Sequence, residues 1–211
     1  MIRKITRKNL EKFLAKYATS EKVLDLGSGG SSYDRFFPNR VTVDIDPDRK
    51  PDIVADARSL PFKDGEFDFV LCTEMLEHVK NPFEVESEIR RVTVIGGTLV
   101  LTTRFLFPLH DTPHDYWRFT KYGLRNLFKE WEIIELVDET ESFSAIAAIL
   151  QRLQFQTILK ANKVSKLFIL VFIVVFDRIN WLIKKEYGDI KRNKIETNIM
   201  STGYYIVCKK R

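Results

Sequence analysis

A glycine-rich break in a short apolar run is the feature that most constrains this chain. The run VLDL, residues 23–26, carries one carboxylate, Asp25, and is followed directly by GSGG, residues 27–30. Glycine adopts φ > 0 without strain and lets a ligand approach the main chain closely. In open α/β sheets, ligands bind outside the carboxyl ends of the strands. The break therefore predicts a ligand cradle, with a tight turn that holds no ligand as the structural alternative.

Strand-like runs alternate with helical segments over the first two-thirds of the chain. Apolar runs without alternation, typical of strands covered on both faces, lie at residues 22–26, 40–44, 52–55, 67–73 and 98–103. Helical patterns lie at residues 2–17, 32–37, 83–92 and 121–129, and two more strands are predicted at 131–137 and 203–208. This alternation predicts an α/β fold with a doubly wound, seven-stranded, mostly parallel, Rossmann-like sheet.

The pattern changes after the sixth predicted strand. Residues 143–159 have apolar positions at a helical period, and residues 167–176 are ten consecutive apolar residues. We interpret residues 1–211 as one domain, with a helical insertion at residues 142–190 between the last two strands.

An acid at the end of the second predicted strand narrows the class of ligand. Asp44 follows the glycine-rich turn, and a carboxylate at that place can accept hydrogen bonds from a ribose diol. The dinucleotide fingerprint is incomplete because Ser32 stands at its third glycine, which disfavours an NAD-dependent oxidoreductase, and no P-loop lysine is present. The pattern indicates a nucleotide or nucleoside without identifying which one.

Three ordered motifs resemble a known family. The runs VLDLGSGG, VTVDID and DIVADARSLPFKDGEFDFVLCTEMLEHV resemble the class I S-adenosylmethionine-dependent methyltransferases of the methyltransferase domain 11 type. The resemblance covers residues 20–137 and the last strand, and it implies the cofactor S-adenosyl-L-methionine. It assigns cofactor contacts to Asp25, Gly27, Ser28 and Gly29 in the loop, Asp44 at the ribose, Ile45, Asp56 and Ala57 at the adenine, and Thr73 and Glu74 near the methionyl group.

No metal is expected from the sequence. Methyl transfer from a sulfonium is an in-line displacement that depends mainly on holding the nucleophile close and aligned. Cys72 and Cys208 lie far apart and match no metal-ligand spacing, so we interpret them as thiols in a reducing, cytoplasmic compartment.

A second polar cluster, FPLHDTPHDYWRFT at residues 107–120, follows the fifth predicted strand. We expect it beside the methyl group, with catalytic residues His110, His114 and Asp115 and with substrate-binding residues Tyr116, Trp117 and Arg118. His78, in the motif EMLEHV, matches a position usually filled by histidine in the family that the chain resembles, and we count it with the substrate-binding residues. The structural alternative is a packed corner in which Arg118 pairs with Asp115 and Trp117 lies in the core.

The acceptor is suggested by one further resemblance. The string PHDYWRFT resembles the members of this methyltransferase family that are found in bacterial surface-polysaccharide and lipopolysaccharide gene neighbourhoods. This resemblance implies that the methyl acceptor is a sugar hydroxyl on a nucleotide sugar or lipid-linked saccharide. Alternatives are another small metabolite such as a quinone or lipid precursor, an RNA-binding methyltransferase, and a scaffold without catalysis.

Positive charge is concentrated in the last quarter of the chain. Residues 151–211 carry 13 Lys+Arg and 4 Asp+Glu, which suggests an anionic partner. The apolar segment is interrupted by Asp177 and Arg178, so it is too short to span a bilayer. It either caps the acceptor site or forms a homodimer interface, or it lies on the anionic inner face of the membrane. No nucleic-acid partner is expected, because the basic residues flank apolar helices.

The basic N-terminus has no apolar h-region, so no signal peptide is predicted.

Overall fold

The computed structural model describes residues 4–30, 33–160 and 162–211. The chain divides into two compact units, and each is described by itself. The sheet unit consists of Phe13–Arg104, Leu109–Val137 and Tyr204–Arg211. The helical unit consists of Met1–Lys12, Phe105–Pro108 and Asp138–Gly203, so it is wider than the insertion predicted at residues 142–190.

A seven-stranded sheet forms the centre of the sheet unit. Its strands are β1 (Val23–Leu26), β2 (Arg40–Asp44), β3 (Ile53–Val54), β4 (Phe67–Thr73), β5 (Thr93–Arg104), β6 (Trp131–Asp138) and β9 (Gly203–Lys210). The order is β3-β2-β1-β4-β5-β9-β6, and the pairs β1–β2, β1–β4, β2–β3 and β4–β5 are parallel. The prediction of a doubly wound, mostly parallel, Rossmann-like sheet is confirmed. The strand order reverses between β1 and β4, and the carboxyl ends of these two strands are where such sheets bind ligands.

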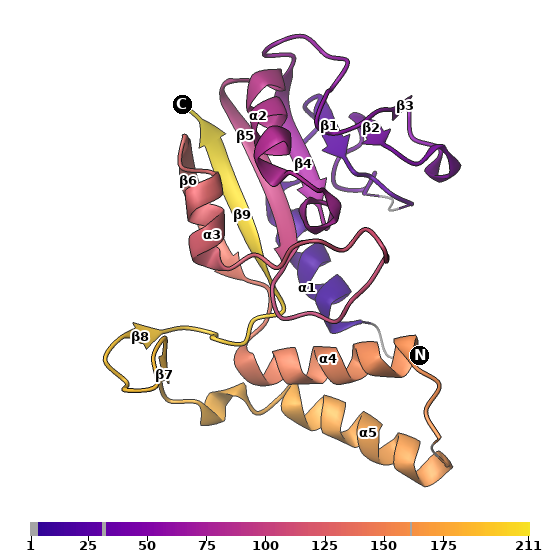
Figure 1. The fold of residues 1–211 in the computed structure, drawn as a ribbon, viewed down its shortest axis with the longest axis vertical. Helices are drawn as coiled ribbons and strands as arrows, with labels where there is room; N and C mark the ends of the chain where they lie inside the picture. The colour runs from indigo at the N-terminus through magenta and orange to yellow at the C-terminus, as the bar shows by residue number, and fades with distance from the viewer. Residues whose placement is uncertain (1–3, 31–32, 161) are drawn as a thin grey trace. The chain divides into compact units, whose positions relative to one another are not determined.

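Helix α2 (Pro82–Val92) covers one face of this sheet, in front of β4 and β5 (Figure 1). Asn81 begins the helix, because its side chain accepts a hydrogen bond from the Phe83 amide and Pro82 occupies the first turn. Val85, Ile89 and Val92 are fully buried, and each contributes about 1.5–3 kcal/mol by leaving water. The unit also contains α3 (Lys121–Leu127) and the short 3-10 helices η1 (Ala15–Tyr17), η2 (Pro47–Arg49) and η3 (Leu76–His78).

The predicted helix at residues 32–37 is wrong for the part that the structure describes. Residues 34–36 form a turn and residues 33 and 37 are irregular, while Ser31 and Ser32 lie outside the described residues. Six residues are too few to repay the cost of nucleating a helix, and Pro38 follows directly. Tyr33 and Phe37 are nevertheless buried, so this segment packs as an irregular connection.

The helical unit is built on α4 (Ser142–Gln156) and α5 (Lys163–Phe176), which run side by side (Figure 1). The unit also holds most of α1 (Ile5–Leu14), η4 (Asn180–Leu182) and an antiparallel pair, β7 (Glu186–Tyr187) with β8 (Ile195–Glu196). Its small core contains Ile5, Ala147, Ala148 and Ile173. Among the described residues, no helix combines the length and apolar character needed to cross a bilayer.

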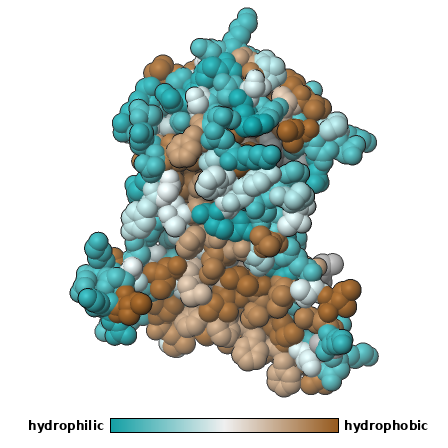
Figure 2. Space-filling view, in the orientation of Figure 1, coloured by the Kyte–Doolittle hydropathy of each residue, from teal (hydrophilic) through white to brown (hydrophobic). Residues whose placement is uncertain are grey.

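One face of α5 is apolar and exposed, and Figure 2 shows hydrophobic side chains gathering over this helix pair. Ile173 is buried against α4, and Ile169 and Phe176 pack against the same core. Leu170 is half-buried, and seven other apolar side chains of the helix are at least two-fifths exposed: Val164, Leu167, Phe168, Val171, Phe172, Val174 and Val175. The helix thus buries one stripe and leaves an apolar stripe uncovered.

Candidate active site

The glycine-rich turn after β1 has the backbone that the sequence predicts. Gly27 has φ +68° and Gly29 has φ +55°, a region that favours glycine. A Cβ atom on Gly27 would lie 2.2 Å from Cγ of Met75, so this position cannot carry a side chain unless Met75 moves. The amide of Gly29 donates to Oδ2 of Asp44 at 2.8 Å, which ties the turn to the end of β2. Turn and acid therefore form one rigid element.

A cavity of about 510 Å³ opens at the carboxyl ends of β1, β2 and β4. Its volume lies in the range of small-molecule and cofactor sites, about 300–1,000 Å³. On one side it is lined by predicted cofactor residues, Gly27, Gly29, Asp44, Ile45, Asp56, Ala57 and Glu74. On the other side it is lined by three predicted acceptor residues, His78, His114 and Tyr116. The two predicted clusters thus line one continuous cavity.

The lining fits a nucleoside. Ile45 is 66% exposed, and it offers apolar surface at the cavity wall. The Asp44 carboxylate lies next to it and can accept hydrogen bonds from a ribose diol. Glu74, at the end of β4, has φ +52° and pairs with Arg104, and its carboxylate suits the positive charge of an ammonium or sulfonium group. A Rossmann-like site that seats S-adenosyl-L-methionine needs these features, and the residues present supply them.

Three predicted cofactor residues do not line this cavity. Asp25 is fully buried and forms an ion pair with Arg40, which also contacts Asp34. Ser28 is buried and lines a separate hollow. Thr73 is buried, and its hydroxyl lies 3.5 Å from that of Tyr33. A contact of these side chains with the cofactor stays a prediction.

We expect the buried Asp25 to make stability depend on pH. Burial raises the pKa of Asp25 to about 6 against the opposing effect of Arg40, whereas the unfolded value is about 3.9. Between about pH 4 and 6 the native state holds a proton that the unfolded state has released, so this contribution to stability falls as pH rises. We therefore expect the free energy of unfolding of the wild type, measured relative to that of Asp25→Asn, to fall as pH rises from about 4 to 6. The size of the fall is about 1.4 kcal/mol for each unit by which the native pKa of Asp25 exceeds the unfolded pKa.

Urea denaturation at several pH values measures this difference. Asp68→Asn is the control for loss of a carboxylate, because Asp68 is exposed on the same sheet, and this variant should keep the fall of stability with pH. An advantage of the wild type over Asp25→Asn that grows as pH rises would contradict the prediction.

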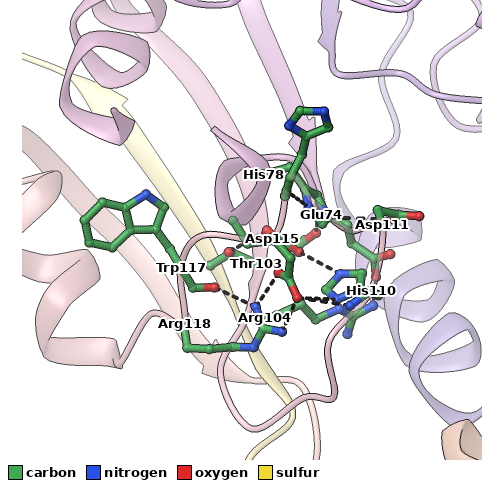
Figure 3. A network of polar contacts seen from close by, with 12 residues as sticks. Glu74, His78, Thr103, Arg104, His110, Asp111, Asp115, Trp117 and Arg118 are labelled. Carbon is green, nitrogen blue, oxygen red and sulfur yellow. Dashed lines mark hydrogen bonds and ion pairs between the residues drawn. The ribbon is translucent and has the colours of Figure 1, made fainter. Parts of the chain in front are cut away.

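The acceptor loop is fixed by Asp115 (Figure 3). Its side chain, 1% exposed, binds both terminal nitrogens of Arg118, at 2.6 and 2.7 Å, and accepts from the His110 amide at 3.0 Å. Arg118 holds the pKa of Asp115 at about 2, so the carboxylate is a weak base and is suited to positioning the loop. The predicted alternative of an Arg118–Asp115 pair is thus what the structure contains.

Trp117 and His110 also lie away from the cavity lining. The Trp117 ring is 40% exposed, which differs from the core position of the structural alternative, and its Nε1 donates to the Val79 carbonyl at 2.9 Å. His110 is buried, with Nδ1 3.5 Å from Asp115 and Nε2 3.9 Å from Glu77. Of the predicted catalytic residues, His114 is the one that lines the cavity, with Nδ1 3.1 Å from the Tyr116 hydroxyl.

Sequence reasoning did not assign a role to several residues at the site, among them Met75, Glu77 and Arg104, which lie at or just beyond the carboxyl ends of β4 and β5. Met75 and Asp111 line the cavity, Arg104 pairs with Glu74, and Glu77 contacts His110. Their position directly after predicted strands was the available signal, because parallel strands place such residues at one edge of the sheet.

Residues 24–101 match the family described as methyltransferase domain, methyltransferase domain 11. The predicted resemblance to the class I S-adenosylmethionine-dependent methyltransferases is thereby confirmed for this part of the chain.

The relatives are similar over only part of their length. An uncharacterised protein of Methanocaldococcus jannaschii is 28% identical over 138 residues, which cover 60% of this chain and 66% of that protein. A ubiquinone biosynthesis O-methyltransferase of Dechloromonas aromatica is 40% identical over 73 residues, 27% of this chain and 32% of that protein. The chain thus matches from about one-third to just under two-thirds of the length of these relatives.

Solved structures agree on the fold. Geranyl diphosphate C-methyltransferase from Streptomyces coelicolor, solved with Mg²⁺, geranyl diphosphate and S-adenosyl-L-homocysteine, superposes with a TM-score of 0.61 at 12% identity. The superposition covers 97% of this chain and 77% of that one. At this identity the likeness concerns the fold alone.

Proposed function

We propose that this chain transfers the methyl group of S-adenosyl-L-methionine to a hydroxyl group of a small molecule. The observation that carries the proposal is the single cavity lined by Gly27 and Asp44 at one side and by His114 at the other. When bound, the cofactor supplies an electrophilic methyl group on a sulfonium. The protein's contribution is to hold the acceptor oxygen in line with that methyl group and to exclude competing water.

His114 is the proposed general base. It lines the cavity, and its Nδ1 faces the Tyr116 hydroxyl at 3.1 Å, a contact that orients the ring. The amide of Tyr116 donates to the Glu77 carbonyl at 2.9 Å, so the loop is attached to η3. A positioned imidazole can take the proton of an acceptor hydroxyl as the new oxygen–carbon bond forms.

The acceptor that we propose first is a sugar hydroxyl of a nucleotide sugar or lipid-linked saccharide. Three basic side chains, Arg49, Arg58 and Lys80, line the cavity together with polar groups, and they suit an acceptor that carries phosphate. Arg49 and Arg58 also contact Asp46 and Asp56. The second candidate is a phenolic hydroxyl of a quinone precursor, which the likeness to the ubiquinone biosynthesis enzyme favours.

Two measurements test this function. Thermal unfolding with S-adenosyl-L-homocysteine or NAD should show stabilisation by the former alone; no stabilisation by S-adenosyl-L-homocysteine would remove the proposal. Mass spectrometry with isotopically labelled S-adenosyl-L-methionine should then detect labelled methyl transfer to nucleotide sugars or lipid-linked saccharides. Transfer to quinone precursors would favour the second candidate, and transfer to RNA alone would contradict a small-molecule acceptor.

We also propose that the exposed stripe of α5 lies on an anionic lipid bilayer. The stripe continues into Trp181 and Leu182, which are 78% and 54% exposed, and aromatic side chains of this kind suit the headgroup region. Basic residues flank it at both ends, Lys163 and Lys166 before it and Arg178, Lys184 and Lys185 after it. An apolar stripe between basic ends is the arrangement that peripheral helices use on anionic membranes.

Flotation with vesicles of phosphatidylcholine and phosphatidylglycerol tests the lipid contact. Each basic residue near such a surface contributes about 1 kcal/mol, so Lys184→Glu with Lys185→Glu should weaken binding at least tenfold. The matched control, Lys129→Glu with Lys209→Glu, makes the same charge change on exposed lysines of the sheet unit and should bind as the wild type does. A wild type that does not float, or that pairs through α5 as a homodimer in the presence of vesicles, would contradict the lipid contact.

A further inference from the structure

Three metal-ligating side chains meet beside the acceptor loop. Glu77, His78 and His110 each present a ligand atom, and these atoms lie within 4.8 Å of one another. The two imidazole rings are 4.7 Å apart between centroids and nearly perpendicular. Glu77 and His78 come from η3, whereas His110 comes from the loop after β5, so the fold brings the three together from two segments.

The Glu77 carboxylate is aimed into this cluster. Its side chain is fully buried; Oε2 accepts from the Thr103 hydroxyl at 2.7 Å, and Oε1 has no hydrogen-bond partner among the described residues. Oε1 instead faces Nε2 of His110 at 3.9 Å. A buried carboxylate oxygen without a partner is costly and calls for an explanation such as an ion.

Both histidines are held in the orientation that metal ligands need. Nδ1 of His78 lies 2.7 Å from the carbonyl oxygen of His114, so Nδ1–H donates there and Nε2 carries the lone pair. Nδ1 of His110 faces the Asp115 carboxylate at 3.5 Å, with Nε2 toward Glu77. Ligating imidazoles typically donate their other ring N–H to a carbonyl or carboxylate in this way.

Acidic side chains surround the cluster. Four carboxylates lie on these two segments, and they belong to Glu74, Glu77, Asp111 and Asp115. Arg104 pairs with Glu74, and Arg118 pairs with Asp115. Oδ2 of Asp111 lies 3.9 Å from Nε2 of His78, so Asp111 is a further oxygen ligand within reach of the cluster.

We propose that Glu77, His78 and His110 bind a divalent transition metal ion, with Zn²⁺ as the first candidate. Two imidazoles and one carboxylate are a common ligand set for zinc, and Asp111 or a water molecule would complete the coordination. Ligand atoms about 2.1 Å from one ion lie at most about 4.2 Å apart, so the cluster closes by about half an ångström on binding. This proposal differs from the expectation of no metal in the sequence analysis. The ligand set was not visible in the sequence, because a helix and a strand separate His78 from His110.

Isothermal titration of the metal-free wild type with ZnCl₂, without any methyltransferase cofactor, tests the site. We expect one equivalent to bind, and we expect Glu77→Gln and His110→Ala to weaken binding at least tenfold. Glu86→Gln is the matched carboxylate control, because Glu86 is also buried but binds Trp131 Nε1 at 2.7 Å away from the cluster. His114→Ala is the matched histidine control and should bind zinc as the wild type does. His114 contacts His78 through its main-chain carbonyl, which the substitution leaves in place.

The outcomes separate this site from the methyltransferase function. If Glu77→Gln fails to fold, His78→Ala carries the test, because its side chain is partly exposed. A wild type that binds no stoichiometric zinc, or zinc binding equal in the wild type and all cluster variants, would overturn the metal site. Binding of S-adenosyl-L-homocysteine is measured separately by thermal unfolding, so either proposal can fail alone.

Discussion

Replacing Gly27 with alanine should abolish the stabilisation by S-adenosyl-L-homocysteine and lower the melting temperature. Two costs combine at this position. An alanine held at φ +68° costs about 1–2 kcal/mol, and its Cβ would lie 2.2 Å from Cγ of Met75 and 2.6 Å from Cβ, which forces a displacement costing about 1–3 kcal/mol. Because both Gly27 and Met75 line the cavity, that displacement enters the cofactor's place, and we expect at least a tenfold loss of affinity.

Gly30→Ala is the control for this result. Gly30 lies three residues further along the same turn, its φ is outside the left-handed region, and a Cβ there meets no atom of the described residues within 4 Å. Its stability should stay within about 0.5 kcal/mol of the wild type, with the thermal shift retained. A Gly27→Ala variant that still responds fully to S-adenosyl-L-homocysteine would show that the turn does not hold the cofactor.

The sheet could be predicted from the sequence because its strands are short apolar runs with clear ends. β2 and β4 begin and end at the predicted residues, and β1 begins one residue later than predicted. β5 starts at Thr93 instead of residue 98, because it continues through Gly96 and Gly97, which we read as a break between elements. Glycine interrupts a strand pattern in sequence, yet a β-bulge can accommodate it, and the register between β4 and β5 does shift there.

The cofactor side of the site could be predicted because its geometry is local. Positive φ at Gly27 and Gly29 and an acid at the end of the next strand follow from the turn itself. The acceptor side depends in part on contacts between distant segments, such as that of Glu77 with His110, which no spacing reveals. Asp115 is adjacent to His114 in the sequence, but its carboxylate binds Arg118 and is held at a low pKa, so it cannot share the role of base. Glu77 was missed because its burial depends on the loop after β5.

Replacing His114 with glutamine should lower the rate of methyl transfer by at least 100-fold while leaving the thermal shift with S-adenosyl-L-homocysteine unchanged. General-base catalysis contributes about 10²–10⁴ in rate, and glutamine keeps a polar side chain near the Tyr116 hydroxyl but cannot take a proton at neutral pH. The measurement is single-turnover transfer of labelled methyl to the acceptor that the screen identifies, under saturating cofactor.

Tyr116→Phe tests whether His114 transfers a proton or only positions the acceptor. It removes the hydroxyl that faces His114 Nδ1 but keeps the ring that lines the cavity. The lost hydrogen bond is worth about 0.5–1.5 kcal/mol, so the rate should fall by roughly tenfold at most, well short of the His114→Gln loss. Equal losses in the two variants would make His114 a positioning residue, and an unchanged rate in His114→Gln would assign the base to another group. Because both side chains are exposed on the loop, neither substitution should alter folding, and the comparison measures chemistry alone.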